Sequence, residues 1–235
     1  MAIQQKLMQV RQELQDATES SHRDMNSVTL LAVSKGQEIN KIRDAYQSGQ
    51  KSFGESYVQE SKVKIEQLQD LAICWHFIGP IQSNKTAEIA KDFDWVQSID
   101  RVKIARRLND QRPEKKGPLQ VCVQVNLFEE STKQGATLAE LPALLQQVEQ
   151  LPQLNLRGIM AIPPKQSQPE QQFKQFAAIA ELFKQYQTQF PHMDTLSMGM
   201  SGDMTAAIAA GSTLVRVGSA IFGPRPNNWK QTIQR

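Results

Sequence analysis

The segment Thr29-Leu30-Leu31-Ala32-Val33-Ser34-Lys35-Gly36 is a short, mostly apolar run that ends in a lysine and a glycine. Such a run, bounded by a turn residue, is typical of a strand that is buried on both faces. Similar runs recur along the chain. In sequence order, the predicted strands cover residues 29–34, 51–54, 73–78, 95–98, 119–126, 155–162, 195–198 and 212–217.

Helical patterns fill the intervals between these strands. They cover residues 41–48, 57–68, 85–91, 101–109, 138–150, 170–189 and 204–210, and an amphipathic helix over residues 2–20 precedes the first strand. Alternating strands and helices indicate a parallel sheet, and eight such strands are typical of a closed barrel. The alternative is an open doubly wound sheet, but the G-x-G-x-x-G turn that usually follows its first strand is absent. We therefore predict an α/β fold, a single (β/α)8 TIM barrel with an extra N-terminal helix.

Composition narrows the class of protein. The chain shows no candidate linker, so we expect one domain over residues 1–235, with the helix within 1–22 and a loose polar tail over 224–235. The net charge of +3 is too small for a nucleic-acid-binding face, and no apolar run is long enough to cross a membrane. Both cysteines fall in predicted buried strands, as reduced thiols do in the cytosol. We expect a cytoplasmic protein without nucleic-acid or membrane partners.

Lys35 is the first candidate site residue, because it stands at the end of a predicted barrel strand. Functional groups of such barrels gather at the C-terminal ends of the strands. Burial pushes a lysine toward the neutral amine, which is the form that condenses with an aldehyde to a Schiff base. The alternative is an ordinary strand-ending lysine in solvent, since lysine is rarely buried.

Two small loops follow the seventh and eighth strands. They read Gly199-Met200-Ser201-Gly202-Asp203 and Gly218-Ser219-Ala220. Barrels often hold a phosphate group at these two loops, where backbone N–H groups and serine hydroxyls bind anions. Either loop alone is equally well explained as a tight turn, but together they favour a phosphate site.

Arg216 interrupts the apolar eighth strand and needs a partner there. One interpretation is an ion pair with an acidic residue, and the other is a donor to a bound ligand. Barrel closure places the first and eighth strands side by side, which brings together Lys35, Arg216 and the loop at Gly218-Ser219. At one end of the barrel, an amine could bind the aldehyde of pyridoxal 5'-phosphate (PLP), the small loops its phosphate, and the arginine its ring nitrogen.

Other motifs give weaker evidence for a functional site. The segment Gly199–Asp203 fails the G-x-S-x-G pattern of a hydrolase nucleophile, because position 203 is aspartate. His76 is expected to be a core histidine that is satisfied by a hydrogen bond. Cys74 beside His76 lacks the ligand count of a zinc site.

In these residues and in several longer segments, the chain resembles the YggS/PROSC family of pyridoxal phosphate homeostasis proteins. The resemblance rests on residues 30–35 (LLAVSK), 53–60 (FGESYVQE), 75–85 (WHFIGPIQSNK), 98–101 (SIDR), 158–163 (GIMAIP) and 196–223. It implies a barrel like the N-terminal domain of alanine racemase and a Schiff base on Lys35. It also implies that Ser201, Gly218 and Ser219 bind the phosphate and that Arg216 faces the pyridine nitrogen.

The resemblance implies a function as well. Members are thought to buffer or deliver PLP, with apo-PLP enzymes as acceptors, and to influence amino-acid and keto-acid metabolism without established catalysis. Two positions depart from the family pattern: Gly36 replaces a threonine, and Ser56 replaces an asparagine that is expected near the cofactor. Ser56 is shorter, so its contact with the cofactor is left open.

A carrier is favoured over an enzyme for two reasons. An arginine at the pyridine nitrogen makes the ring a weaker electron sink than a carboxylate partner does. Related racemases and decarboxylases also add a second domain and a dimer partner, for which we expect this chain to have no residues, so we expect a monomer. The alternatives are a low-activity PLP-dependent amino-acid racemase or lyase, and a barrel that binds another phosphorylated metabolite without a Schiff base.

Overall fold

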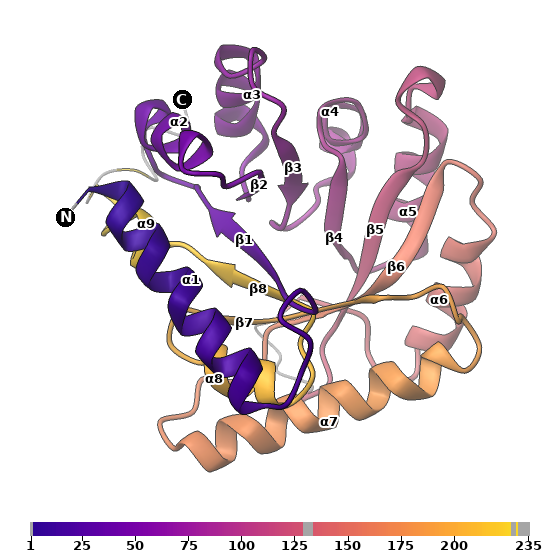
Figure 1. Ribbon diagram of the computed structural model, residues 1–235. Coiled ribbons are helices and arrows are strands. Elements are labelled where there is room, and N and C mark those ends of the chain that lie inside the picture. Colours follow the sequence, from indigo (N-terminus) through magenta and orange to yellow (C-terminus); the bar gives the residue numbers. More distant parts are fainter. Residues whose placement is uncertain (1, 129–133, 227–228, 230–235) are drawn as a thin grey trace.

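Eight parallel strands close into a barrel in chain order, which confirms the predicted fold class (Figure 1). The computed structural model describes residues 2–128, 134–226 and 229. The first and last strands pair with each other, and this pairing completes the barrel. The strands are β1 Thr29–Val33, β2 Ser52–Glu55, β3 Cys74–Phe77, β4 Trp95–Ile99, β5 Leu119–Val125, β6 Leu154–Ala161, β7 Thr195–Met200 and β8 Leu214–Val217.

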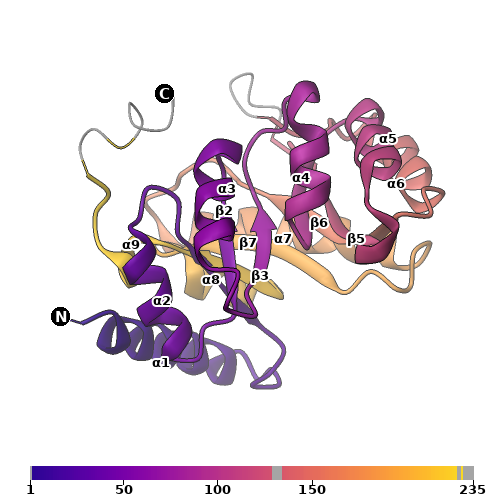
Figure 2. The ribbon, with the colours of Figure 1, turned by 90° about the horizontal axis from the view of Figure 1, so that it is seen from above.

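Helices surround the barrel (Figures 1 and 2). They are α1 Ile3–Ser20, α2 Ile39–Gln47, α3 Val58–Gln67, α4 Thr86–Asp92, α5 Val102–Gln111, α6 Leu141–Glu149, α7 Pro169–Gln187, α8 Met204–Ala209 and α9 Ser219–Phe222, with 3-10 turns η1 Ser83–Lys85 and η2 Glu114–Lys116. The helix α1 precedes the barrel and packs against α8, α9 and α2. Its buried residues Leu7, Val10 and Leu14 recur at three- and four-residue steps, so one apolar stripe of α1 packs on the neighbouring helices.

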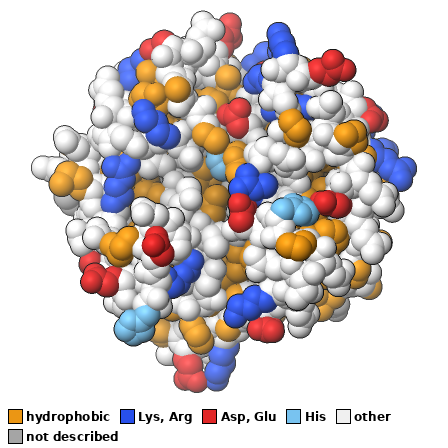
Figure 3. Space-filling view, turned by 45° about the vertical axis from the view of Figure 1, so that its right-hand side comes forward, with side chains coloured by type: hydrophobic (Ala, Val, Ile, Leu, Met, Phe, Trp, Pro, Cys, Tyr) orange, Lys and Arg blue, Asp and Glu red, His pale blue; other side chains and the backbone are white. Residues whose placement is uncertain are grey.

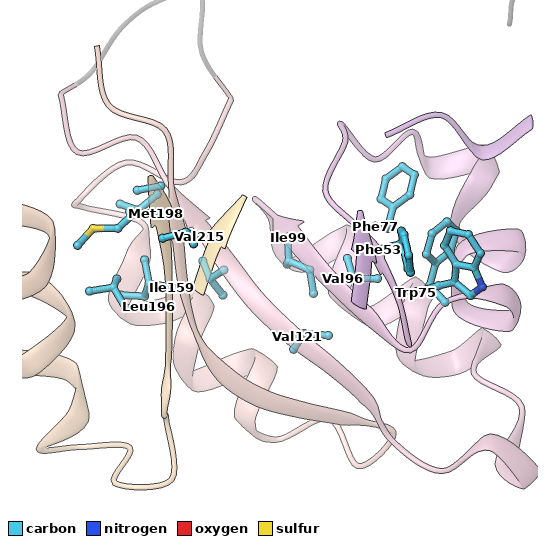
Figure 4. Close-up of a cluster of buried hydrophobic side chains, with 14 of the residues drawn as sticks. Phe53, Trp75, Phe77, Val96, Ile99, Val121, Ile159, Leu196, Met198 and Val215 are labelled. Carbon is cyan, nitrogen blue, oxygen red and sulfur yellow. The ribbon is translucent and has the colours of Figure 1, made fainter. Parts of the chain in front are cut away.

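The strands supply most of the core. Parallel strands buried on both faces have nearly continuous apolar sequences, and β5 has this character over its whole length. Phe53, Phe77 and Ile99 are almost completely shielded from solvent. Figure 4 shows such side chains from several strands gathered in the interior.

Some elements differ from the prediction. The short helix α9 and both 3-10 turns were not predicted, because a segment of three or four residues is too short to show a helical period. The tail predicted over 224–235 lies largely outside the described residues, which here include only 224–226 and Trp229. Among the helices of the described segments, none has the length and apolar character needed to span a bilayer.

Candidate cofactor site

Strand register brings five of the predicted site residues to one end of the barrel. Arg216 in β8 pairs with Leu31 in β1 on one side and with Met200 in β7 on the other. Lys35 and Gly218-Ser219 follow these paired segments directly, as does Ser201. Their backbones therefore leave three adjacent strands at the same C-terminal edge.

Lys35 lies just beyond β1 and is half-buried. Burial lowers the pKa of its ammonium, and the guanidinium groups of Arg225 and Arg216 lower it further. Glu55 and Glu60 act in the opposite direction on the same pKa. A lowered pKa increases the neutral fraction of the amine, which is the nucleophilic form.

Arg216 is buried, with 5% of its surface exposed. Its Nη1 donates to the carbonyl of Ser197 at 2.8 Å and to the Ser197 hydroxyl at 2.7 Å, and Nη2 donates to the carbonyl of Ala161 at 3.0 Å. These partners are neutral oxygens, and Arg216 forms no ion pair with an acidic side chain of the described residues, so the ion-pair interpretation is not supported there. Burial lowers the guanidinium pKa to about 10, so it stays protonated at neutral pH. The Nε–H makes no hydrogen bond with the described residues and remains a donor for a ligand.

The first predicted phosphate loop connects β7 to α8. A Cβ on Gly199 would lie 2.5 Å from the Cβ of Ala207, and its φ is +93°, so this position requires glycine. Asp203 Oδ1 accepts a hydrogen bond from the Met200 N–H at 2.5 Å and folds the loop back on the strand. Ser201 is exposed and borders a hollow of about 490 Å³ between α7 and α8. That hollow is lined by neither Lys35 nor Arg216, so it adjoins the site rather than forming it.

The second predicted phosphate loop lies directly against β1. A Cβ on Gly218 would come within 3.0 Å of the Val33 carbonyl oxygen, so a glycine allows this close approach. Ser219 begins α9, and the first N–H groups of a helix have no partner within it. These N–H groups and the exposed Ser219 hydroxyl are therefore available as donors beside β1.

Ser56 follows β2, the strand that neighbours β1 on its other side, and is buried. A Cβ on Gly79 would lie 2.2 Å from the Ser56 carbonyl oxygen, which shows how tightly this turn packs against the loop after β3. The structure therefore places Ser56 at the same end of the barrel as the other site residues.

A buried charged network beside Lys35 was missed by the sequence reasoning. Lys64 in α3 donates to Glu55 Oε1 at 2.8 Å and to Glu60 Oε1 at 2.5 Å. Glu55 ends β2, and burial raises the pKa of its carboxyl group despite the opposing effect of Lys64. The spacing of Glu60 and Lys64 was visible in the sequence, but an exposed i,i+4 pair has the same spacing.

Arg225 and Trp229 were also missed, and they explain one departure from the family pattern. Arg225 Nε donates to the Lys35 carbonyl at 3.1 Å, and its guanidinium lies 5.2 Å from the centre of the Trp229 ring. Gly36 has φ +70°, and a Cβ there would lie 2.9 Å from Trp229 Cε3. The threonine that the family pattern has at this position would not fit against Trp229.

His76 is a core residue, as predicted. It is buried, its Nδ1 is 3.0 Å from Gln97 Nε2, and burial lowers its pKa to about 3. Burial also raises the pKa of its neighbour Cys74 to about 11, so the thiol stays protonated. Both residues line a hollow of about 250 Å³ at the N-terminal end of the strands.

Figure 3 shows a face that is hollowed near its centre, with charged and histidine side chains around the hollow.

Comparison with known proteins identifies relatives that have the same fold and belong to one family. Residues 9–226 match the family described as alanine racemase, N-terminal domain. A protein of Vibrio alginolyticus named pyridoxal phosphate homeostasis protein is 51% identical over 95% of this chain and 98% of its own length. The structure of PipY from Synechococcus elongatus PCC7942 with PLP bound is 37% identical, covers 94% of this chain and all of that chain, and gives a TM-score of 0.83.

A more distant structure shares the fold alone. Alanine racemase from Corynebacterium glutamicum is 15% identical, with a TM-score of 0.66 over 96% of this chain and 64% of that chain. The close matches extend over nearly the full length of both partners, and they agree with the family model. The chain therefore belongs to the pyridoxal phosphate homeostasis protein family and has the barrel fold of the alanine racemase N-terminal domain.

Proposed function

We propose that this protein binds PLP reversibly through a Schiff base on Lys35 and serves PLP homeostasis as a carrier or buffer. One observation carries the proposal: β1 pairs with β8, so Lys35 leaves the barrel beside Arg216 and the Gly218-Ser219 loop. The name of the Vibrio alginolyticus relative and the PLP bound to PipY support the same ligand.

The residues present fit the chemistry of PLP. The Lys35 amine would hold the aldehyde carbon, and the N–H and hydroxyl donors at Ser201, Gly218 and Ser219 would hold the phosphate. Arg216 would donate to the pyridine nitrogen, which is an acceptor when unprotonated. When bound, PLP supplies an electrophilic carbonyl and an electron-withdrawing ring.

Arg216 supports a carrier rather than an enzyme. Its guanidinium, with a pKa of about 10, donates a hydrogen bond without giving up its proton at neutral pH. The ring nitrogen would therefore stay unprotonated, which makes the ring a weaker electron sink. A low-activity racemase or lyase is the competing function, and sustained turnover of an amino acid that is lost with Lys35→Ala would establish it.

Covalent trapping tests the linkage. Purified protein is mixed with PLP, its visible absorbance is recorded, and borohydride is added before mass spectrometry of the peptides. We expect an absorbance band and one reduced adduct, on Lys35. Lys35→Ala should lose both, whereas Lys91→Ala, a change at an exposed lysine of α4, should keep both. A Lys35→Ala protein that keeps the band and the adduct would contradict the proposal.

We propose further that the protein acts as a cytoplasmic monomer and that apo-PLP enzymes accept its cofactor. Two free thiols, Cys74 and Cys122, are compatible with a reducing compartment. Loaded protein is mixed with an apo-enzyme in the presence of a trap for free PLP. Activation that survives the trap indicates direct transfer, and activation that the trap abolishes indicates release into solution. Light scattering of the loaded protein gives its mass.

A further inference from the structure

A buried charged network, formed by Glu55, Glu60 and Lys64, lies beside the lysine of the proposed cofactor site. Lys64 is 3% exposed and Glu55 is fully buried. Besides its two carboxylate partners, Lys64 Nζ donates to the carbonyl of Ser34 at 2.7 Å. The ammonium thus connects β2 and α3 to the end of β1.

This network holds the backbone on both sides of Lys35. On one side, the Ser34 hydroxyl donates to Glu55 Oε1 at 2.6 Å, and the Ser34 carbonyl accepts from Lys64. On the other side, the Gly36 N–H donates to Glu60 Oε1 at 2.6 Å. Each of these contacts ends on a neighbour of Lys35, and the Lys35 amine makes no hydrogen bond with the described residues, so it is available for a ligand.

Stability alone does not account for such a network. Buried ion pairs cost desolvation energy, and apolar residues of similar volume are often as stabilising or more so. Here the cost is increased, because Glu55 Oε2 and Glu60 Oε2 are buried without a hydrogen-bond partner among the described residues. What the charges provide, and apolar residues cannot, is a set of directed bonds to the peptide groups that flank Lys35.

We propose that Glu60, supported by Lys64 and Glu55, is a positioning residue that fixes the direction of the Lys35 amine for condensation with an aldehyde. The inference rests on the proposed function in one respect, namely that Lys35 forms the linkage to PLP. The network makes no hydrogen bond with the Gly218-Ser219 loop among the described residues. Positioning therefore acts on the covalent step and not on binding of the phosphate.

Variants of Glu60 test this with a matched control. Glu60→Leu removes the acceptor of the Gly36 N–H, whereas Glu60→Gln keeps an oxygen at the same place. The control is Glu170→Leu, because Glu170 forms an exposed i,i+4 pair with Lys174 in α7 and has the same local spacing. Glu55→Gln/Lys64→Met is a second variant, which removes the ammonium together with its fully buried carboxylate partner and leaves Glu60 with the Gly36 N–H alone.

Two measurements separate positioning from a general structural role. The first is the rate of Schiff-base formation with PLP at saturation, and the second is the affinity for pyridoxine 5'-phosphate, which has no aldehyde. In Glu60→Leu we expect the rate to fall about tenfold or more, since misplacing a reacting group by about 1 Å costs up to about a hundredfold. The affinity should stay within about twofold, and Glu60→Gln and Glu170→Leu should resemble the native protein. An equal loss of rate and affinity in Glu60→Leu would overturn the inference.

A cofactor-free measurement keeps this test distinct from that of the proposed function. Amide hydrogen exchange at Gly36 should be faster in Glu60→Leu and in the double variant, and unchanged in Glu170→Leu. Unchanged exchange at Gly36 in both network variants would overturn the inference whether or not PLP binds. Failure of the native protein to form an adduct at Lys35 would overturn the proposed function, and the exchange result would still decide whether the network holds this segment.

Discussion

Gly36 occupies a position where backbone and neighbours both exclude a side chain. Its φ of +70° costs an L-residue about 1 to 2 kcal/mol, and its Cβ would meet Trp229 and Arg225. We expect Gly36→Thr to lower the free energy of unfolding by more than this strain and to displace Trp229 from Tyr57, whose ring centroid lies 5.5 Å away. Urea unfolding and tryptophan fluorescence measure the two effects.

Gly117 is the matched control for this change. It has φ +65° and nothing within 4 Å of an added Cβ, so Gly117→Thr carries the backbone strain without the contact. Equal destabilisation by the two substitutions would show that the side chains around Gly36 move aside without lowering the free energy of unfolding.

His76 makes the stability of the protein dependent on pH. Burial lowers its pKa from 6.5 to about 3 in the folded protein. Between these two values the unfolded chain binds a proton that the folded protein does not, so stability is full above pH 6.5 and is lost as the pH falls toward 3. We expect this residue to account for a loss of about 2 to 3 kcal/mol between pH 7 and pH 4.5, at about 1.4 kcal/mol per pH unit.

The comparison that isolates this effect is between the native protein and His76→Gln. Both contain the same carboxylates, so the difference between their unfolding free energies at pH 7 and pH 4.5 reports on the histidine. Parallel pH profiles for the two proteins would show that His76 does not titrate in the way its burial implies.

At the scale of elements, α1 packs against α8, α9 and α2 on the outside of the barrel. Leu7 is fully buried in this helix, which packs on α8 and α9, whereas Met8 is 62% exposed. We expect Leu7→Ala to cost about 2 to 5 kcal/mol, because it leaves a cavity in the packed face. Met8→Ala should stay within about 0.5 kcal/mol. Thermal unfolding measures both, and similar shifts would mean that α1 is not anchored by this stripe.

The elements also show which parts of the fold could be predicted from the sequence. All eight strands were predicted, because a barrel strand is buried on both faces and its apolar run is local in the sequence. α9 was missed, since four residues show no period. The Lys64 network was missed for a different reason. Its bond to Ser34 joins residues 30 positions apart, and Glu60–Lys64 has the same spacing as the exposed pair Glu170–Lys174. Only tertiary packing distinguishes the two pairs.

At the scale of the whole molecule, closure pairs every strand with two neighbours, so the barrel has no free sheet edge. The proposed ligand groups come from β1, β7 and β8, which lie at opposite ends of the sequence. We propose that the described residues form one cooperative unit, in agreement with the single domain expected from the sequence. A site assembled from both ends of such a unit stabilises all of it when occupied.

Calorimetry tests this cooperativity. We expect a single transition, and PLP at about 100 times its dissociation constant should add about 2.7 kcal/mol to the free energy of unfolding. For a chain of this size that corresponds to a rise in Tm of roughly 5 to 10 °C, at about 2 to 4 °C per kcal/mol. Lys35→Ala should show a smaller rise with PLP, but the same rise as the native protein with pyridoxine 5'-phosphate, since only the covalent bond is lost. Two transitions of which only one moves with PLP would mean that the two ends of the chain do not unfold together, and the cooperative unit would have to be divided.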